Sequence, residues 1–411
     1  MSHTHVVSVT ERTDSPSQTL PRVLVPVMAA GAGFSVASLY YAQPMLGSMA
    51  VSLGSSEASI GLVPTLTQLG YAAGIALLAP LGDRFERRGI ILLKSMLLAV
   101  ALLAAGLAGH LPSVLLASLL VGLMATVAQD VVPAAATLAA PEHRGAIVGR
   151  VMTGLLLGIL LSRVVSGVVA ETFGWRTMFI GAAASVVLMG LLLRVTLPRF
   201  APTTTLGYGA LLRSMGTLWM QLPPLRRAVL AQALLAMGFS AFWSTLALML
   251  HTRFGIGSAG AGAFGIAGAA GALAAPLAGR FADRIGTQRV ARAAIGIALL
   301  GFASLLLDGL LPPALQLVLL AVSAVIFDFG FQAALVSHQT LVYGLQPEAR
   351  SRLNALLFTG VFVGMAAGGG LGALALAHGG WNGVALLACA TSAAALWVRR
   401  QVAAPRAARG G

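Results

Sequence analysis

Residues 141–175 read PEHRGAIVGRVMTGLLLGILLSRVVSGVVAETFGW, and residues 347–381 repeat their landmarks. The shared landmarks are Pro-Glu-x-Arg at the start, Thr-Gly and Gly in the middle and Gly-Trp at the end, each pair 206 positions apart. A shorter echo links Gly33-Phe34-Ser35 to Gly238-Phe239-Ser240 at a spacing of 205. Landmarks kept in constant register over a long segment indicate an internal duplication. The chain is therefore predicted to consist of two related halves.

The composition excludes a water-facing surface for most of the 411 residues. Charged residues make up 9% and hydrophobic residues 58%, whereas a soluble domain carries roughly 25% charged residues. The net charge of +14 then indicates arginine-rich loops of a membrane protein rather than nucleic-acid binding. The single cysteine, Cys389, excludes an internal disulfide and a cysteine-based metal site. The first twenty residues lack an apolar run, so we expect a polar tail there and no signal peptide.

Hydrophobic runs divide the chain into membrane spans, each of which needs about 20 apolar residues. We expect twelve, at residues 23–46, 60–81, 89–109, 113–138, 146–170, 178–197, 228–250, 260–281, 290–307, 313–343, 353–378 and 383–398. The predicted fold class is an all-α membrane protein with twelve transmembrane helices in two parallel six-helix halves. The expected divisions are a polar tail (1–22), the first half (23–197), a central loop with an interfacial helix around 208–222 (198–227), the second half (228–398) and a basic tail (399–411).

Arginine placement predicts how the chain sits in the membrane. Nearly all loop arginines fall on one side of these spans, and the opposite loops hold only Arg176 and Arg253. Positive charge marks cytoplasmic loops, so both termini are expected in the cytoplasm. An even number of spans in each half keeps the two halves parallel, with a binding site expected between them at the membrane midplane.

Similar charged motifs follow the second and eighth spans. Residues 79–88 read APLGDRFERR and residues 279–286 read GRFADRIG. The pattern resembles the G-x-x-x-D-R-x-G-R signature of the major facilitator superfamily, although Ala79 and Glu86 stand where glycines are usual in the first copy. The resemblance implies a cytoplasmic gate made of Asp83, Arg84, Arg87, Arg88, Gly279, Asp283, Arg284 and Gly286.

The resemblance covers residues 23–398 and is strongest to the twelve-span, drug/proton-antiporter-like branch, including bacterial permeases labelled arabinose-efflux-like. It rests further on YYAQP at 40–44, QLGY at 68–71 and PEARSRLN at 347–354. The Gly-Pro pair usual in span 5 is missing, and Ser118 replaces the arginine usual in span 4.

The family implies a secondary active transporter of the bacterial cytoplasmic (inner) membrane. We expect export of a small organic compound such as a drug, sugar or metabolite, in exchange for protons, by rocking of the two halves. The expected partners are that substrate, the lipid bilayer and protons. No cofactor, metal or nucleic acid is expected, and the expected energy source is the proton gradient. The functional unit is expected to be a monomer.

Charged residues inside predicted spans are costly, so each is a functional hypothesis by default. Asp130, Arg163 and Asp328 lie deep in spans 4, 5 and 10. At 1.5 Å per residue, Asp130 and Arg163 differ in depth by roughly 15 Å, which argues against a direct pair. We expect Asp328 or Asp130 to exchange protons, with Arg163 setting the pKa of that carboxylate or contacting substrate. The alternative is a structural charge satisfied by backbone or polar neighbours.

Polar and aromatic residues in spans 1, 2, 4, 7 and 10 are candidates for the substrate cavity. They are Tyr40, Tyr41, Gln43, Thr65, Gln68, Gln129, Phe242, Trp243, Thr245 and Gln332. Interfacial aromatics and interhelical hydrogen bonds would explain each of them equally well.

Other functions on the same membrane architecture remain open at this point. A proton-coupled importer or a uniporter would use the same fold. A membrane-embedded enzyme is disfavoured because the chain lacks an H-E-x-x-H pair and a P-loop, and no G-x-S-x-G elbow has the flanking strand and helix that it needs. A sensor without transport activity would need a signalling domain that neither tail is long enough to supply.

Overall fold

The computed structural model describes residues 23–140, 143–202, 204, 206–268, 274, 277–278, 280–282, 284–346 and 349–400. These residues form helices and no strands. The first half contains α1 Leu24–Ala37, η1 Gln43–Met45, α2 Leu46–Leu53, α3 Glu57–Ile60, α4 Leu62–Leu78, α5 Leu81–Arg84, α6 Arg87–Leu107, α7 Leu111–Met124, α8 Val127–Leu138, α9 Arg144–Phe173 and α10 Trp175–Thr196. After α11 Tyr208–Gln221 follow α12 Pro223–Phe254, α13 Ser258–Ala263, η2 Phe264–Gly268, α15 Thr287–Ser304, η3 Leu305–Leu310, α16 Pro313–Tyr343 and α17 Arg350–Arg400.

Within the described residues, nine helical stretches are long and apolar enough to cross a membrane. One of them, α17, holds both the eleventh and the twelfth predicted spans, and a break in its helical path at Gly380 separates the two. The first predicted span is instead split into α1, a turn and η1, with α2 beginning at its last residue. The eighth falls where the structure describes only part of the chain. The spans therefore follow the predicted order, with interruptions that hydropathy does not reveal.

The duplicated Gly-Trp landmark is a helix junction in both halves. Gly174 ends α9 with φ of 85°, and Gly380 breaks α17 with φ of 59°. L-residues with a side chain avoid this left-handed region, whereas glycine adopts it freely. The tryptophan that follows each glycine, Trp175 or Trp381, opens the next helix and is buried. In the first landmark of each copy, the Pro-Glu pair at 141–142 and 347–348 lies outside the described residues, and the arginine that ends the landmark begins α9 or α17.

The duplicated glycines in the middle of each copy bring helix backbones into contact. A Cβ on Gly158 would lie 2.4 Å from the carbonyl oxygen of Gly33 in α1, and a Cβ on Gly364 would lie 2.1 Å from the carbonyl oxygen of Ala233 in α12. In membranes, small residues at an interface let two helices approach closely. The pairs α1–α9 and α12–α17 are thus equivalent packing units in the two halves.

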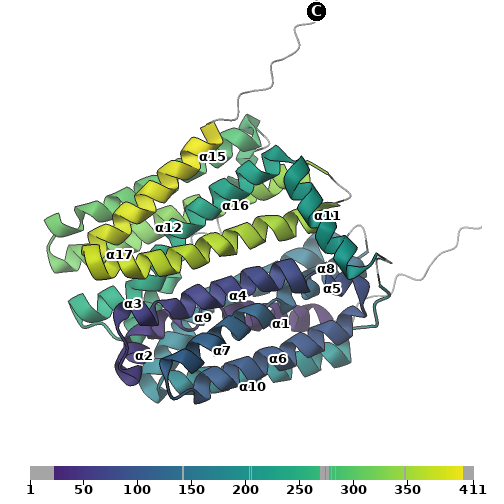
Figure 1. Cartoon of the computed structure of the whole chain (residues 1–411), viewed down its shortest axis with the longest axis horizontal. Helices are drawn as coiled ribbons and strands as arrows, with labels where there is room; N and C mark the ends of the chain where they lie inside the picture. The colour runs from purple at the N-terminus through teal and green to yellow at the C-terminus, as the bar shows by residue number, and fades with distance from the viewer. Residues whose placement is uncertain are drawn as a thin grey trace, which may run out of the picture.

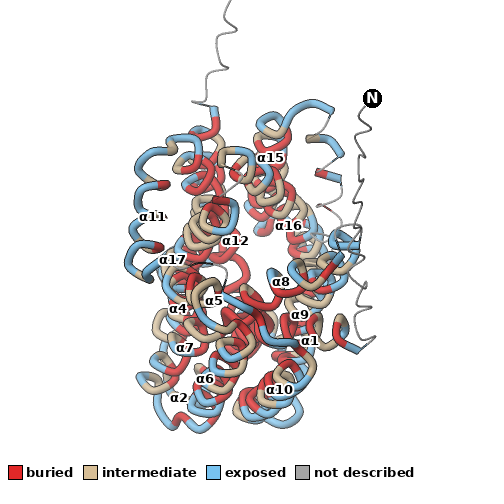
Figure 2. The backbone as a smooth tube through the Cα atoms, turned by 90° about the vertical axis from the view of Figure 1, so that its right-hand side faces the viewer, coloured by how far each residue is buried: buried red, intermediate tan, exposed pale blue. Residues whose placement is uncertain are grey.

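The two halves lie side by side, with α1 to α10 below and α12 to α17 above in Figure 1. They meet along α4 and α17 and again where α9 packs on α13 and η2. We call the end that holds α5 and α11 the arginine-rich end, and the end that holds α2 and α3 the opposite end. Figure 2, which looks onto the arginine-rich end, shows buried residues concentrated inside each half.

Helix α11 lies beside the arginine-rich end, where the sequence predicts an interfacial helix. Its Leu218 packs with Leu225 of α12 and Leu353 of α17, and Tyr208 donates a hydrogen bond to the Leu77 carbonyl at 2.7 Å. Helix α12 begins at Pro223, inside the expected central loop, and α17 continues through Arg400, two residues into the expected basic tail.

We predict that Gly122→Ala destabilises the protein, because the new Cβ would lie 1.9 Å from the Thr67 carbonyl oxygen and push α7 away from α4. Overpacking of this kind costs about 1–3 kcal/mol, which a lower melting temperature of the purified protein would reveal. The control is Gly181→Ala in α10, whose Cβ would meet nothing within 4 Å. Equal melting temperatures for the two variants would contradict the close α4–α7 packing.

Candidate functional site

A guanidinium group lies at the junction of the two halves. Arg163 of α9 is 5% exposed, and its Nε donates to Oε1 of Gln43 at 2.8 Å. Its Cζ lies 4.8 Å from the centre of the Tyr40 ring and 4.5 Å from the centre of the Trp243 ring. Aromatic faces attract a cation at this distance. Arg163 of α9 is therefore contacted by η1 and the turn before η1 in its own half, and by α12 of the other half.

A carboxylate without an ion-pair partner lies beside this guanidinium. Asp328 of α16 is 3% exposed, and its Oδ2 has no hydrogen-bond partner among the described residues. Arg163 is close enough to act on it electrostatically, yet their charged atoms do not come within ion-pair distance of 4.0 Å. The Trp243 indole also lies near this carboxylate, without a hydrogen bond of good geometry. Asp328 and Arg163 thus share an aromatic neighbour while each keeps a free polar atom.

The backbone around these two charges is interrupted in both halves. In the second half, a Cβ on Gly265 of η2 would lie 2.9 Å from the Cβ of Arg163, and a Cβ on Gly268 would lie 3.1 Å from Asp328 Oδ2. In the first half, α1 ends at Ala37, so that Tyr40 lies in a turn and Gln43 in η1. Interrupted helices at mid-membrane occur where backbone lines a cavity or is buried in protein.

A second interruption divides the fourth predicted span into α7 and α8. The break at Ala125 frees its carbonyl, which accepts a hydrogen bond from Ser35 of α1 at 2.7 Å. Gln129, just past this break, donates to the Tyr71 hydroxyl at 3.2 Å. The Tyr71 ring meets the Phe362 ring of α17 edge to face, with centres 4.4 Å apart, so this contact also joins the two halves.

The remaining expected cavity residues are spread over the bundle. Phe242 is fully buried in an aromatic core with Phe327, and Thr245 donates to the Ala241 carbonyl of its own helix at 2.7 Å. Thr65 lies against Gly369 at the α4–α17 interface. The other three are buried or half-buried on α4, α16 and the turn after α1: Gln68, Gln332 and Tyr41.

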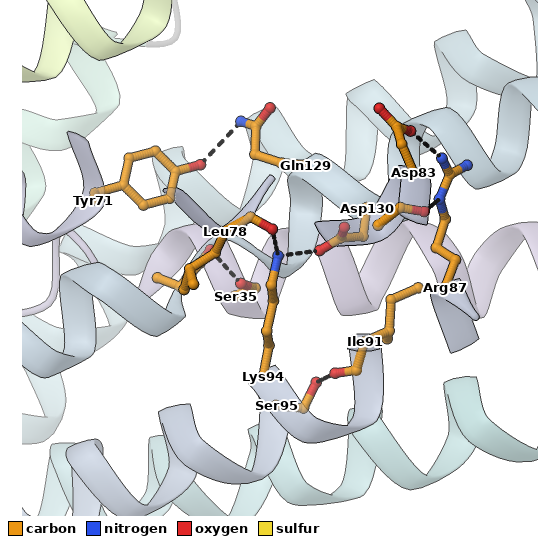
Figure 3. A network of polar contacts seen from close by, with 12 residues as sticks. Ser35, Tyr71, Leu78, Asp83, Arg87, Ile91, Lys94, Ser95, Gln129 and Asp130 are labelled. Carbon is orange, nitrogen blue, oxygen red and sulfur yellow. Dashed lines mark hydrogen bonds and ion pairs between the residues drawn. The ribbon is translucent and has the colours of Figure 1, made fainter. Parts of the chain in front are cut away.

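A separate ionic network lies within the first half, near its arginine-rich end (Figure 3). Lys94 Nζ of α6 donates to Asp130 Oδ2 at 2.7 Å and to the Leu78 carbonyl, where α4 ends, at 3.1 Å. The Lys94 and Asp130 side chains are 5% and 2% exposed. Gly82 leaves room for the carboxylate, because its Cβ would lie 2.3 Å from Asp130 Oδ1. Asp130 is therefore neutralised inside one half and does not meet Arg163.

The first copy of the expected gate motif, after α4, makes its contacts within the first half. Arg87 pairs with Asp83 at 2.9 Å, and Arg88 donates to the Leu197 carbonyl at 3.0 Å. Glu86, which departs from the usual glycine, accepts hydrogen bonds from the amides of Arg88 and Gly89 and so caps α6.

The second copy of the gate motif is only partly visible. Gly279 and Asp283 lie outside the described residues. Arg284 is exposed. Gly286 directly precedes α15 and has a φ of 88°, a positive value like that of Gly174 before α10. In the first copy, Arg84 stacks near Phe85, with its Cζ 5.6 Å from the ring centre.

Lys94 is the site residue that sequence analysis missed. It lies inside the third predicted span, where any ionisable group marks a functional or structural site. Its depth below the arginine-rich end also matches that of Asp130 within a few residues. A search of all spans for opposite charges at similar depth would have found this pair.

At the opposite end the two halves are closed against each other. Ser258 of α13 lies with its Oγ 3.5 Å from that of Ser48 in α2, and the Ala259 amide donates to Glu171 Oε2 of α9 at 2.7 Å. A cavity of about 230 Å³ between Ser48, Glu171, His251 and Ser258 lies beside these contacts. Five of the six buried residues of α9 follow position 161, so α9 is packed mainly toward this closed end.

The chain matches the model of a known protein family over most of its length. The Major Facilitator Superfamily model matches residues 28–342 and, in a second match, residues 228–410. The chain belongs to the Major Facilitator Superfamily. It is therefore a multi-pass membrane transporter and not an enzyme. The fold expected from the sequence is confirmed, while the drug/proton-antiporter-like branch stays a prediction.

Two relatives are similar over most of their length. A protein of Escherichia coli O157:H7 named as an uncharacterized transporter, YgaY, is 38% identical over 90% of this chain and 93% of its own. A protein of Streptomyces coelicolor named as a probable transporter, SCO4007, is 33% identical over 91% of this chain and 86% of its own.

Solved structures share the fold at low sequence identity. The nucleoside transporter NupG has a TM-score of 0.72 at 17% identity, covering 92% of this chain and 98% of its own. A bacterial homologue of the human lysosomal transporter Spinster has a TM-score of 0.70 at 16% identity, covering 92% and 94%. These similarities support the arrangement of the helices and carry no information about substrate.

We predict that Lys94→Met lowers the stability of the protein, because Asp130 would remain buried without its partner. Removing one partner of a buried ion pair costs about 3–5 kcal/mol, whereas replacing both by apolar groups is often neutral. The double variant Lys94→Met with Asp130→Leu should therefore recover most of the lost melting temperature. Arg150→Gln, at an exposed position of α9, is the control. A single variant that melts like the wild type would contradict a buried pair.

Proposed function

We propose that the protein exports a small organic compound in exchange for protons. The observation that supports this most is the Arg163 cluster, in which one half contributes a guanidinium and the other contributes Trp243 and Asp328. Such a site changes whenever the two halves move, because its contacts cross the junction between them. A charge inside a membrane bundle that faces the other half is a functional hypothesis by default.

Asp328 is the stronger of the two candidates for proton exchange. Asp130 has a lysine partner within its own half, so a movement of one half against the other leaves that pair intact. Asp328, at the junction, has an oxygen without a hydrogen-bond partner among the described residues. An isolated carboxylate in an apolar interior needs either a proton or a donor group. A proton and a donor group of the substrate would therefore compete for Asp328, and this competition couples their opposite movements.

Alternating access follows from the same contacts. Contacts of Ser48, Ser258 and Glu171 close the opposite end, so we propose that the site opens toward the arginine-rich end in this state. Opening the opposite end must separate α9 from α13 and Arg163 from Trp243, which exposes Arg163 and Asp328 to that side. We propose that the substrate enters from the arginine-rich end and that a proton arriving from the opposite side promotes its release.

The arginine-rich end is proposed to face the cytoplasm. The described arginines of α5, α6, α11, α12 and α17 gather there, and only Arg176 and Arg253 lie toward the opposite end. Positive residues are retained on the cytoplasmic side of membrane proteins. In this orientation, both termini would lie on the cytoplasmic side of a bacterial inner membrane. No contact between copies is needed to complete the site, so we propose a functional monomer.

The proposed function is tested by transport into inverted vesicles across a panel of drugs, sugars and organic acids. We expect uptake of a compound that collapses when an uncoupler removes the proton gradient. Uptake that resists the uncoupler would indicate a uniporter, and proton-driven accumulation in right-side-out vesicles would indicate an importer. Either result would contradict proton-coupled export.

For the transported compound, we predict that Asp328→Asn reduces proton-driven uptake at least about tenfold, a change of about 1.4 kcal/mol in coupling. Exchange of substrate for substrate without a gradient should persist, since asparagine keeps the shape and a polar contact. The control is Glu57→Gln in α3, away from the site, assayed in proteoliposomes at equal protein content. Full proton-driven uptake by Asp328→Asn would remove Asp328 from the coupling step.

A disulfide across the closed end should stop transport. In a Cys389→Ser background, we predict that Ser48→Cys with Ser258→Cys forms a cross-link on oxidation, because the two hydroxyl oxygens are 3.5 Å apart and neighbouring Cβ atoms suit a disulfide. Transport should be lost and then return with a reductant. Ser304→Cys with Ser323→Cys is the matched control, since these oxygens lie 2.7 Å apart within the second half. A locked but active first pair would exclude opening at this end.

A further inference from the structure

Another buried arginine, at the arginine-rich end, has no ion-pair partner among the described residues. Arg399, in the last turn of α17, is 3% exposed. Its Nε and Nη2 have no hydrogen-bond partner among the described residues. None of the three ion pairs that the described residues form includes Arg399. A buried charge without compensation is strongly unfavourable, so this guanidinium calls for a counter-charge.

Two more arginines surround this position. Arg292 near the start of α15 and Arg227 near the start of α12 are close enough to act on Arg399 electrostatically. Arg292 is half-buried and Arg227 is exposed, whereas Arg399 is buried. Repulsion among three cations from three helices would be relieved by an anion placed between them.

A further polar atom without a partner among the described residues lies in α12, beside a histidine that Arg399 reaches electrostatically. His338 of α16, which Arg399 also reaches electrostatically, forms a 2.7 Å hydrogen bond between its Nδ1 and Oε1 of Gln232. Because an amide oxygen only accepts, Nδ1 is the donor. The Gln232 amide nitrogen then remains a donor without a partner. Several unsatisfied donors point to a ligand rich in acceptor oxygens.

The other half pairs its two buried cations at the same end with carboxylates. Lys94 pairs with Asp130 and Arg87 pairs with Asp83, so two carboxylates of the chain neutralise two cations there. Around Arg399 the described chain supplies none. The two halves are duplicates, yet among the described residues the buried cations of the first half at this end have carboxylate partners and the buried Arg399 of the second half has none.

We propose that Arg399, Arg292 and Arg227 bind a phosphate group, which in the membrane is supplied by the headgroup of an anionic lipid. Arg399 lies in the final turn of the last span, and therefore near the level of lipid headgroups. Basic pockets between helices at this level bind anionic headgroups. A phosphodiester supplies the negative charge and the several oxygens that the guanidinium groups and the Gln232 amide lack.

The test measures melting of the purified full chain in neutral detergent, with phosphatidylglycerol, phosphatidylcholine or inorganic phosphate added. We expect phosphatidylglycerol to raise the wild-type melting temperature by at least about 3 °C, since a ligand that binds only the folded state stabilises it. Phosphatidylcholine should have no such effect. Arg399→Gln should lose the response to phosphatidylglycerol while melting no lower than the wild type in detergent alone, because it removes an uncompensated charge.

The control variant is Arg150→Gln, which removes an exposed arginine of the first half and should respond to phosphatidylglycerol like the wild type. Stabilisation by phosphatidylglycerol but not by inorganic phosphate would identify a lipid site, and equal stabilisation by both would identify a site for free phosphate. A response that persists in Arg399→Gln would overturn the proposal. So would the absence of any response to either anion, or a melting temperature of Arg399→Gln well below the wild type without lipid.

Discussion

A guanidinium inside a membrane bundle must be surrounded by groups that replace water. For Arg163 these groups are the Gln43 amide and the faces of Tyr40 and Trp243. They come from both halves, so the charge is accommodated only while the halves are in contact. The breaks in the first span and in η2 lie at this point because regular helices would not bring Gln43, Gly265 and Gly268 close to the two charges.

The two buried acids of this chain illustrate how position decides the role of a charge. Asp130 and its partner Lys94 lie in one half, and their interaction stabilises that half in every orientation of the other. Asp328 lies at the junction and has no ion-pair partner among the described residues, so its surroundings depend on how the halves are arranged. An ionisable group can couple to a movement only if the movement changes its environment. This difference, and not burial alone, separates a structural charge from a candidate for coupling.

The duplication explains why the glycines of this protein recur at fixed positions. Gly158 and Gly364 serve the close contacts of α9 with α1 and of α17 with α12, and Gly174 and Gly380 provide positive φ at helix junctions. Hydrophobic packing between helices gives little driving force in lipid, so close backbone contact through small residues carries much of the association. The landmarks that identify the repeat are therefore also the residues that hold each half together.

The sequence by itself determined the membrane class, the order of the spans, the duplication and the three deep charges Asp130, Arg163 and Asp328, because hydropathy and spacing are local properties of the chain. It did not reveal the breaks after Ala37 and at Ala125, since turns within apolar runs leave hydropathy unchanged. Only the tertiary structure decided that Asp130 meets Lys94, that Arg163 lies between Tyr40 and Trp243, and that Arg399 has no ion-pair partner in the described part of the chain. These facts depend on which helix faces are in contact, and periodicity alone does not fix the rotation of a helix that is apolar all round.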